Sequence, residues 1–318
     1  MLGYDKQVAL ISGAGRGIGR QHALFLASRG AKVVVNDYGG GLRGENGGNP
    51  APADNVVAEI AAAGGTAMSA CNDITDPAQV KAMVDATVTR FGRLDIVIHN
   101  ASVYAPLGSF QEARIEDLDR ILRVNVHGGW NIVHAAWPYM LANHYGRVVV
   151  TGSGAGFFGR RKDHAYSIAK SALMAFTKVL ATEGEAQGIK ANLVGPIAWT
   201  ENSKLQGIPP LMEHFAPAIL VSNLVAVLAH EACPVNGEMF HCGGGFTSRV
   251  FVGETDGTVF DAASMTPEAV LAGMGAIMDT ADYSIPASSD RSGAHLSAAI
   301  AAANPAFAEA LAKAKHGR

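Results

Sequence analysis

The sequence predicts an α/β fold in which helices cover both faces of a parallel sheet. Three observations support this prediction. Short apolar runs without polar alternation, such as residues 8–11 and 148–151, are typical of strands that are buried on both faces. These runs alternate with stretches of helical periodicity along most of the chain, as in a doubly wound sheet. Glycines and polar residues follow the predicted strands, and ligands bind at these strand ends in such sheets.

Residues 7–37 contain the first predicted strand, helix and strand. A strand at residues 8–11 is followed by the glycine-rich segment 12–19, a helix that runs to Gly30 and a second strand at residues 32–35. This order is the context of a dinucleotide-binding fingerprint, because glycines allow close backbone approach and a helix N-terminus attracts a pyrophosphate. A glycine-rich turn without a ligand is the alternative interpretation.

Asp37 ends the second predicted strand. A carboxylate at this position accepts hydrogen bonds from both hydroxyls of an adenosine ribose and repels a 2'-phosphate, which favours NAD over NADP. Arg43 lies nearby and argues in the other direction, and a solvated turn aspartate is a third interpretation. Residues 39–52 are rich in glycine and proline and form either a mobile flap beside the adenosine or a surface insertion.

The middle of the chain continues the alternation of strands and helices. Asp73 follows the third predicted strand, at residues 66–71, and either contacts an adenine edge or caps the next helix. The fourth strand, at residues 94–98, leads into Asn100. A long helix then carries Asn125 in its middle, where asparagine is unfavourable, so this side chain either bonds to the local backbone or holds a water molecule.

A serine, a tyrosine and a lysine form the predicted catalytic group. The fifth strand, at residues 148–151, delivers Ser153, and Tyr166 and Lys170 lie one helical turn apart on the same face of the next helix. A neighbouring cation favours the phenolate of a tyrosine, whose ordinary pKa of about 10 is too high for a base at neutral pH. These residues suit proton transfer to or from a carbonyl or carbinol oxygen during hydride transfer.

The last part of the predicted sheet consists of strands at residues 190–194 and 237–242, which bring the number to seven. Residues 198–210 are irregular and polar, and we predict that they close over the substrate. A helix is predicted at residues 210–230. Residues 246–318 contain alanine-rich apolar runs that predict helices packing on the core or on a partner subunit.

Composition narrows the function classes. The 318 residues are 48% hydrophobic and carry 25 Lys and Arg against 28 Asp and Glu, a net charge of −3, so no basic surface indicates nucleic acid and no polybasic run indicates a membrane. The three cysteines lack metal-ligand spacing and suggest a reducing compartment. We find no signal peptide and no long uninterrupted apolar run, and therefore expect a cytoplasmic protein without a bound metal.

Taken together, the glycine segment, Asn100, Asn125, Ser153 and the Tyr166-x-x-x-Lys170 pair resemble the short-chain dehydrogenase/reductase family over about residues 5–245. The resemblance implies a Rossmann-type sheet of order 3-2-1-4-5-6-7 in a domain spanning residues 1–245, a C-terminal extension at 246–318, and a homodimer or homotetramer. It also implies that Tyr166 is the acid/base, that Lys170 lowers its pKa and holds the nicotinamide ribose, that Ser153 orients the substrate and that Asn125 holds a relay water.

The candidate site residues follow from the motifs and the resemblance. The candidate catalytic residues are Asn125, Ser153, Tyr166 and Lys170. The candidate NAD-binding residues are Gly13, Arg16, Gly17, Ile18, Gly19, Asp37, Asp73, Ile74, Asn100, Ala101, Ser102, Tyr166, Lys170, Pro196, Ile197 and Thr200. The chain departs from the usual family motifs at three positions, where His99 replaces asparagine and Ser102 and Ile197 replace glycine.

Three functions are compatible with these residues. Residues 33–40, 230–237 and 265–270 are similar to the (3R)-hydroxyacyl-CoA dehydrogenase unit of peroxisomal multifunctional enzyme type 2, which implies oxidation or reduction of a secondary alcohol or ketone such as (3R)-hydroxyacyl-CoA. The segment 160–162, Arg-Arg-Lys, is a candidate site for a CoA phosphate or a solvated loop. The alternatives are a dehydrogenase of steroids or other apolar cyclic alcohols and a non-catalytic dinucleotide-binding regulator, which has no need of the full catalytic set.

Overall fold

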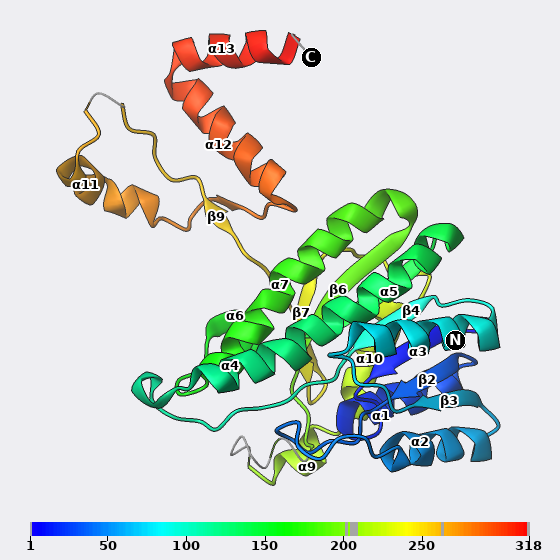
Figure 1. Cartoon of the computed structure of the whole chain (residues 1–318). Helices are drawn as coiled ribbons and strands as arrows, with labels where there is room; N and C mark the ends of the chain where they lie inside the picture. Colours follow the sequence, from blue (N-terminus) through cyan, green and yellow to red (C-terminus); the bar gives the residue numbers. More distant parts are fainter. Residues whose placement is uncertain (1, 201–202, 204–208, 262–263, 317–318) are drawn as a thin grey trace. The chain divides into compact units, whose positions relative to one another are not determined.

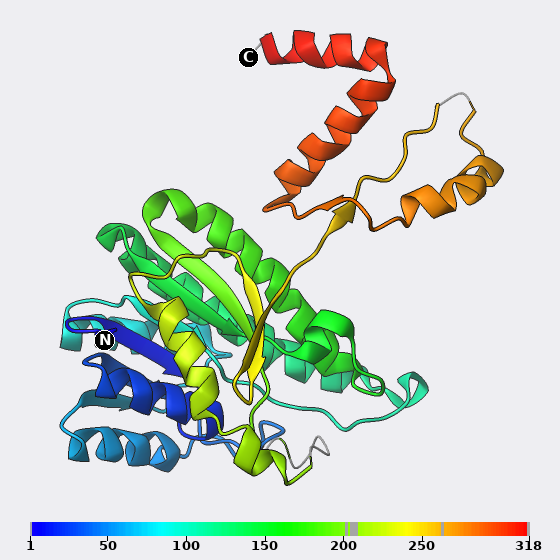
Figure 2. The ribbon, with the colours of Figure 1, turned by 180° about the vertical axis from the view of Figure 1, so that it is seen from behind.

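A computed structural model describes residues 2–200, 203, 209–261 and 264–316. The chain divides into two compact units, Met1–Val250 and Phe251–Arg318, and each is described by itself. The first unit contains a single sheet with helices on both faces, as Figures 1 and 2 show from opposite sides. The predicted boundary after residue 245 falls between the last two strands of this sheet.

The sheet confirms the predicted fold class and strand order and adds one strand. All pairings among the first seven strands are parallel, and the last strand pairs antiparallel with its neighbour. In spatial order the strands are β3 (Thr66–Ala70), β2 (Lys32–Asn36), β1 (Val8–Ser12), β4 (Ile96–His99), β5 (Gly146–Thr151), β6 (Ile189–Pro196), β7 (Met239–Gly243) and β8 (Phe246–Val250). β8 was not among the predicted strands, because its short, partly exposed and polar sequence lacks the apolar run of a central strand.

Two layers of helices bury the two faces of the sheet in separate apolar clusters. One cluster packs the sheet against α1 (Gly17–Ser28), α2 (Ala51–Ala62) and α10 (Ile219–Ala229). The other packs it against α3 (Pro77–Phe91), α5 (Gly128–Asn143) and α7 (His164–Gly184). Because both faces are covered, β1, β2, β4 and β5 consist mostly of apolar residues, which is why apolar runs predicted them.

The helix predicted at residues 210–230 is wrong in its continuity. The structure has α9 (Met212–Phe215) and α10, separated at Pro217, which has no backbone N–H to continue a helix. Met212–Ala229 is the one segment of the described residues that is long and apolar enough to cross a membrane by length and composition. Part of this segment belongs to the core, since α10 contributes Val221, Val225 and Leu228 to the apolar cluster.

The long helix predicted around Asn125 contains an irregular turn. It begins as α4 (Ile115–Leu122), widens into a π-helical segment, η2 (Arg123–His127), and continues as α5. Such π turns are frequently found at functional sites. Short elements complete the unit: η1 (Phe110–Glu112), α6 (Gly154–Phe158) and η3 (Glu185–Gln187).

Within the described residues, the second unit contains three helices and a two-stranded sheet. Its elements are β9 (Glu254–Thr255), α11 (Pro267–Ile277), β10 (Tyr283–Ser284), α12 (Ser289–Ala303) and α13 (Pro305–His316). The helices agree with the apolar runs in the sequence. Neither α11 nor α12 buries a residue fully within the described part of the chain. Packing of this extension on the core or on a partner stays a prediction.

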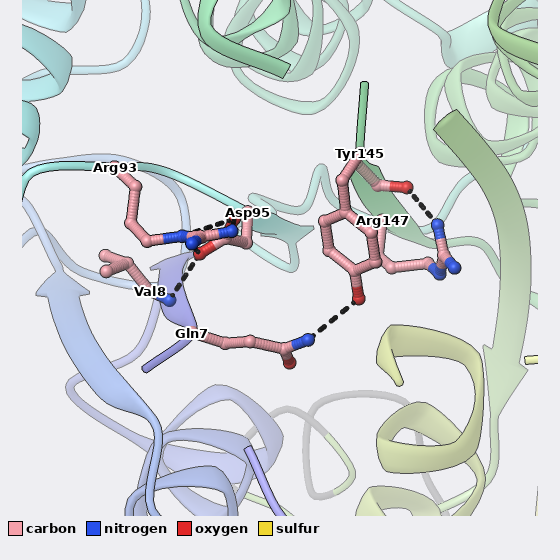
Figure 3. Close-up of polar contacts among 7 residues, drawn as sticks. Gln7, Val8, Arg93, Asp95, Tyr145 and Arg147 are labelled. Atoms are coloured by element: carbon pink, nitrogen blue, oxygen red, sulfur yellow. Dashed lines mark hydrogen bonds and ion pairs between the residues drawn. The ribbon is translucent and has the colours of Figure 1, made fainter. Parts of the chain in front are cut away.

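A polar network ties the amino ends of the central strands together. The side chain of Asp95 is fully buried, accepts a hydrogen bond from Val8 N at 2.9 Å and pairs with Arg93 at 2.7 Å. Gln7 donates to the hydroxyl of Tyr145 at 3.0 Å (Figure 3). The opposite, carboxyl edge of the sheet carries the candidate site.

Candidate active site

A cavity of about 720 Å³ lies at the carboxyl ends of the parallel strands. It brings together most of the residues that the sequence singled out, although they come from loops far apart in the chain. The lining contains Gly13, Arg16, Gly17, Ile18, Asp37, Asp73, Ile74, Asn100, Ala101, Ser102, Ser153, Tyr166, Lys170, Pro196, Ile197 and Thr200. Two candidates, Gly19 and Asn125, do not line it.

The glycine segment forms a tight turn with an open helix end. Gly13 has a φ of 63°, and a Cβ atom there would lie 2.7 Å from the Cα of Ala101. At Gly19, a Cβ atom would lie 2.2 Å from the carbonyl oxygen of Gly13, so this glycine serves packing inside the loop. The N-cap residue of α1, Arg16, makes no side-chain capping bond. The first N–H groups of α1 therefore remain available to an anion, as a pyrophosphate requires.

Asp37 is held in a fixed orientation at the end of β2. Its Oδ2 accepts from Gly15 N at 2.9 Å, and its Oδ1 accepts from Gly39 N at 2.8 Å. Arg16 donates to the carbonyl oxygen of Gly40 at 2.9 Å. Residues of the 39–52 segment also line the cavity, which agrees with the flap rather than with a remote surface insertion: Gly40, Gly41, Leu42 and Gly44. Arg43 does not line it.

The structure distinguishes between the two interpretations of Asp73, the adenine contact and the helix cap. Asp76 is the N-cap of α3, where it accepts from Ala78 N and Gln79 N, so Asp73 does not cap this helix. The carboxylate of Asp73 accepts from Thr75 N at 2.8 Å and lines the cavity. This position is compatible with the predicted adenine contact.

The loop after β4 supports the glycine segment and presents an open hydroxyl. Asn100 Nδ2 donates to the carbonyl oxygens of Ser12 and Gly13, at 3.3 Å and 3.0 Å. Among the described residues, the Ser102 hydroxyl is buried without a hydrogen-bond partner. A buried polar group of this kind in a cavity wall is suited to a ligand. The replacement of glycine by Ser102 therefore adds a polar contact to the cavity.

His99 connects this loop to the π-helical segment. Its buried ring contacts the Ser12 hydroxyl at 3.1 Å through Nδ1 and the Asn125 carbonyl oxygen at 2.9 Å through Nε2. Burial lowers the pKa of His99 to about 4, so the ring is neutral near pH 7. Because a carbonyl oxygen can only accept, Nε2 carries the proton and Nδ1 accepts from Ser12.

The hydrogen bonds of Asn125 bear on the two roles that the sequence left open for this side chain, a local backbone bond and the holding of a water molecule. Its side chain accepts from Val103 N at 2.8 Å and donates to Val103 O at 3.3 Å. The fully buried side chain thus bonds to the backbone of a loop that is 22 residues away in the sequence, and not to the backbone of its own helix as one interpretation proposed. Both the side chain and the main-chain carbonyl of Asn125 are engaged by protein groups. The role of Asn125 in a water relay stays a prediction.

Ser153, Tyr166 and Lys170 meet at the carboxyl end of β5. Ser153 caps α6, since its Oγ accepts from Ala155 N at 3.1 Å, and its hydroxyl also bonds to the Tyr166 hydroxyl. Lys170 donates to Thr151 O at 2.7 Å, and its Nζ lies 5.5 Å from the centroid of the Tyr166 ring. Tyr166 and Lys170 are both buried. The three side chains therefore lie together in the cavity wall, and their role in proton transfer stays a prediction.

The electrostatics of this group differ from the expectation. Burial raises the pKa of Tyr166 well above its ordinary value, the neighbouring Tyr104 adds to this rise, and the Ser153 hydroxyl opposes it. Burial also lowers the pKa of Lys170 to about 7, so its charge is partial near neutral pH. The described residues therefore do not produce the lowering of the Tyr166 pKa that the resemblance implies, because burial disfavours both charged forms.

The sequence did not single out several further residues of the cavity wall, among them Tyr104, Arg120, Arg123 and His241. The only signal for Tyr104 was its position shortly after the polar turn at Asn100. Arg120 and Arg123 lie three residues apart in the helical segment before Asn125, and neither belongs to a recognisable motif. Of the 160–162 segment, Arg160 lines the cavity and pairs with Asp163 at 2.9 Å, whereas Arg161 and Lys162 are exposed outside it.

The predicted closing loop at residues 198–210 can be followed only in part. Thr200 and Ser203 line the cavity, and Thr200 N donates to Ser203 Oγ at 2.8 Å. Residues 201–202 and 204–208 lie outside the described residues. Closure over a substrate stays a prediction.

Comparison with known proteins assigns the family. Residues 7–204 match the model of the family described as short chain dehydrogenase. The chain belongs to this family. It is 38% identical over 272 residues to the peroxisomal hydratase-dehydrogenase-epimerase of Neurospora crassa, an alignment that covers 85% of the chain and 30% of that protein. It is 37% identical over 261 residues to a short-chain type dehydrogenase/reductase of Mycobacterium tuberculosis, covering 82% and 90% of the two chains.

A solved structure is similar over nearly the whole chain. Full-length peroxisomal multifunctional enzyme type 2 from Drosophila melanogaster superposes with a TM-score of 0.77 at 26% identity, covering 93% of this chain and 49% of that one. The predicted resemblance to this group is thereby confirmed. The chain spans about half of that enzyme and 30% of the Neurospora relative, both of which are longer.

Proposed function

We propose that this short-chain dehydrogenase interconverts a secondary alcohol and a ketone with NAD as its hydride carrier, and that a 3-hydroxyacyl-CoA is its substrate. One observation carries the reaction type. Ser153, Tyr166 and Lys170 converge on the same cavity as the glycine segment and Asp37. A dinucleotide bound along the loop after β1 therefore reaches the residues that handle the proton, as alcohol oxidation requires.

The residues of the cavity suit NAD. The open N-terminus of α1 would hold the pyrophosphate, and Asp37 would bind the adenosine ribose and disfavour a 2'-phosphate. Ser102 and Lys170 line the same cavity, and the Ser102 hydroxyl has no hydrogen-bond partner within the described residues. NAD, when bound, supplies the acceptor or donor of the hydride.

Protein groups manage the proton and the reacting oxygen. In the oxidation direction, the carbinol hydroxyl is oriented by Ser153 and gives its proton to Tyr166, which must reach the phenolate form. In the reduction direction, Tyr166 returns this proton to the oxygen. A charged Lys170 close to Tyr166 favours the phenolate, and any positive charge brought into the cavity by a ligand acts in the same direction.

The choice of an acyl-CoA substrate rests on relatives and on charge. The resemblance to the dehydrogenase unit of peroxisomal multifunctional enzyme type 2 favours it. Besides Arg16, the cavity wall contains Arg120, Arg123 and Arg160, and these three arginines favour a substrate with an anionic part over a steroid or apolar cyclic alcohol. Arg120 pairs with Asp117 at 2.7 Å, whereas the Arg123 guanidinium forms no ion pair or hydrogen bond within the described residues.

The test measures the absorbance of the reduced nicotinamide with NAD or NADP and a panel of alcohols. The panel contains (3R)- and (3S)-hydroxyacyl-CoA and several steroid alcohols, and a Tyr166→Phe variant is the control. We expect turnover of the (3R)-thioester with NAD and its loss in the variant. Turnover of steroid alcohols alone would contradict the substrate class and leave the reaction type standing. A cytoplasmic location and a homodimer or homotetramer stay predictions.

A further inference from the structure

An imidazole without a protein partner lies in the wall of the cavity. His241, in β7, lines the cavity and is half-buried. Within the described residues, its ring nitrogens form no hydrogen bond and no ion pair, and Ser248, which lies opposite it on β8, is not bonded to it. The ring nitrogens of His99, by contrast, are both engaged by protein groups. His241 is therefore a polar group of the cavity that a ligand can engage.

Packing holds the His241 ring in place. Its centroid lies 6.1 Å from that of Phe157, and the two rings are nearly perpendicular, at 77°. Phe157 fits there because Gly195, the neighbour of His241 on β6, has no side chain, and a Cβ atom on Gly195 would lie 2.6 Å from the Phe157 ring. A side chain that is positioned by packing loses little conformational entropy when it binds a ligand.

The imidazole stands beside the residue that follows Ser153. A Cβ atom on Gly154 would lie 3.4 Å from both Cε1 and Nε2 of His241, so this edge of the ring lies next to the chain that leaves the candidate catalytic serine. Ser153, Gly154 and His241 all line the same cavity. Under the proposed function, Ser153 and Tyr166 hold the reacting oxygen. The His241 ring is thus placed near the part of a substrate that adjoins its reacting carbon.

His241 is independent of the phenol that handles the proton. The Tyr104 hydroxyl, by comparison, bonds to the Tyr166 hydroxyl, and the two rings are stacked. Within the described part of the chain, His241 shares neither a hydrogen bond nor a ring contact with Tyr166. The pKa of Tyr166 is shifted by burial, by Tyr104, by Ser153 and by Asp163. Replacement of the imidazole therefore leaves these groups around Tyr166 in place.

An unpaired imidazole in this position favours a substrate with a second polar group. A ligand that fills a cavity displaces water from its wall, and a polar group then left without a partner weakens binding. A site that offers a hydrogen bond also discriminates against an analogue without the matching group. A 3-hydroxyacyl thioester has such a group, because its carbonyl carbon is two bonds from the carbinol carbon. A simple secondary alcohol has none.

We propose that the His241 imidazole donates a hydrogen bond to the thioester carbonyl oxygen of the substrate and thereby favours 3-hydroxyacyl thioesters over alcohols without a second oxygen. A neutral imidazole carries one N–H donor, and a carbonyl oxygen can only accept. This inference rests on the proposed function and names a residue that sets its substrate class. His241 is a specificity residue, and the proton of the reacting oxygen belongs to Tyr166.

The test compares His241→Phe with the wild type on two substrates. Phenylalanine keeps a ring beside Phe157 and removes both nitrogens. The first substrate is the N-acetylcysteamine thioester of 3-hydroxybutyrate, and the second is 2-pentanol, which has the reacting group alone and is measured as an inhibitor if it is not turned over. We expect kcat/KM for the thioester to fall roughly tenfold, mostly through KM, and the value for 2-pentanol to change less than about twofold.

Two further variants separate the hydrogen bond from the packing of the ring. His241→Gln retains an N–H donor, and we expect it to restore most of the kcat/KM for the thioester that His241→Phe loses. His134→Phe removes an exposed imidazole of α5 that stacks on Trp130 and does not line the cavity, and we expect neither substrate to be affected. Thermal unfolding of each variant verifies that it is folded.

The possible outcomes are distinct. A loss on the thioester alone, reversed in His241→Gln, supports the inference. An equal loss on both substrates overturns it, because His241 then acts on the reacting group or on the fold. A loss of the same size in His241→Gln overturns it as well, since the shape of the ring then matters and the donor does not. A rise in the KM of NAD alone assigns His241 to the cofactor and also overturns the inference.

The wild type tests the proposed function before any variant is measured. Turnover of 2-pentanol without turnover of the thioester overturns the thioester as substrate, and the inference with it. Turnover of the thioester that is unchanged in His241→Phe overturns the inference alone and leaves the proposed function standing.

Discussion

The two edges of the parallel sheet use buried polar residues for different purposes. At the amino edge, the Arg147 guanidinium donates four hydrogen bonds to backbone carbonyls, and Asp95 is saturated by Val8 N and Arg93. At the carboxyl edge, the Ser102 hydroxyl has no partner within the described residues, and Lys170 uses one donor of three. Saturated groups stabilise the fold, whereas unsatisfied groups cost stability and are available to ligands.

The largest expected effect concerns the carboxyl edge. Tyr166→Phe removes the proton-transferring hydroxyl, and we expect kcat to fall by roughly 10²–10⁴-fold with little change in the unfolding midpoint. The matched variant at the amino edge, Tyr145→Phe, removes a hydroxyl that bonds to Gln7, and we expect it to leave kcat unchanged. Steady-state kinetics and thermal unfolding of both variants test the comparison. It fails if Tyr145→Phe reduces kcat as much as Tyr166→Phe does.

The stabilising role of the amino edge is tested by removing Asp95, a side chain whose carboxylate is fully hydrogen-bonded. Asp95→Ala leaves Val8 N without its partner and the Arg93 charge uncompensated, so we expect the free energy of unfolding to fall by about 3 kcal/mol. Urea denaturation measures this loss, and kinetics on the folded fraction should give the wild-type kcat. The comparison would be contradicted by a variant of normal stability and reduced kcat. Asp85→Ala, which breaks an exposed pair with Lys81, is the control and should change stability little.

His99 combines features of the two edges. Both of its ring nitrogens are hydrogen-bonded, as are the buried groups of the amino edge, but it supports the site loop at the carboxyl edge. Its pKa is lowered to about 4, so the unfolded chain, with an ordinary pKa near 6.5, takes up the proton first as pH falls. The contribution to stability is complete above about pH 6.5 and is lost toward pH 4, on the order of 3 kcal/mol in all. Urea denaturation between pH 4 and 7 should therefore show a shallower pH dependence for His99→Asn than for the wild type.

A second buried histidine, His22, also contributes to the pH dependence but does not affect this comparison. Burial lowers its pKa to about 3, and it is present in both proteins, so its effect cancels in the difference. Parallel curves for the wild type and His99→Asn would show that His99 is not buried in its neutral form.

The smallest expected effect concerns cofactor choice. Asp37→Asn keeps an oxygen that accepts a backbone N–H but removes the charge, so we expect the preference for NAD over NADP, as a ratio of kcat/KM values, to fall roughly tenfold. Asp54→Asn removes an exposed charge outside the cavity and is the matched control. An unchanged ratio in Asp37→Asn would remove Asp37 from the account of cofactor choice.

Local sequence was sufficient for the fold class and much of the site. Continuous apolar runs predicted β1, β2, β4 and β5, because both faces of the sheet are buried at these strands and nearly every side chain lies in the same apolar environment. The glycine segment and the Tyr166, Lys170 spacing predicted their own geometry, since each depends on one turn of backbone. Parallel strands also guarantee that residues following them meet at one edge.

Other features depended on contacts between distant segments. β8 has no apolar pattern of its own and exists by pairing with β7, whereas the break between α9 and α10 is a local effect of Pro217 that the helix prediction overlooked. Tyr104 becomes part of the site only because Leu42, Arg120 and Asn125 fix its loop against Tyr166.

The sequence by itself thus determined the chemistry, because residue type and short spacing decide which groups can ionise, bind an anion or turn the chain. The tertiary structure alone decided how these groups are tuned. Burial raised the pKa of Tyr166 and lowered that of Lys170, against the expectation from their spacing. Desolvation depends on everything packed around a group, and no local pattern in a sequence reports it.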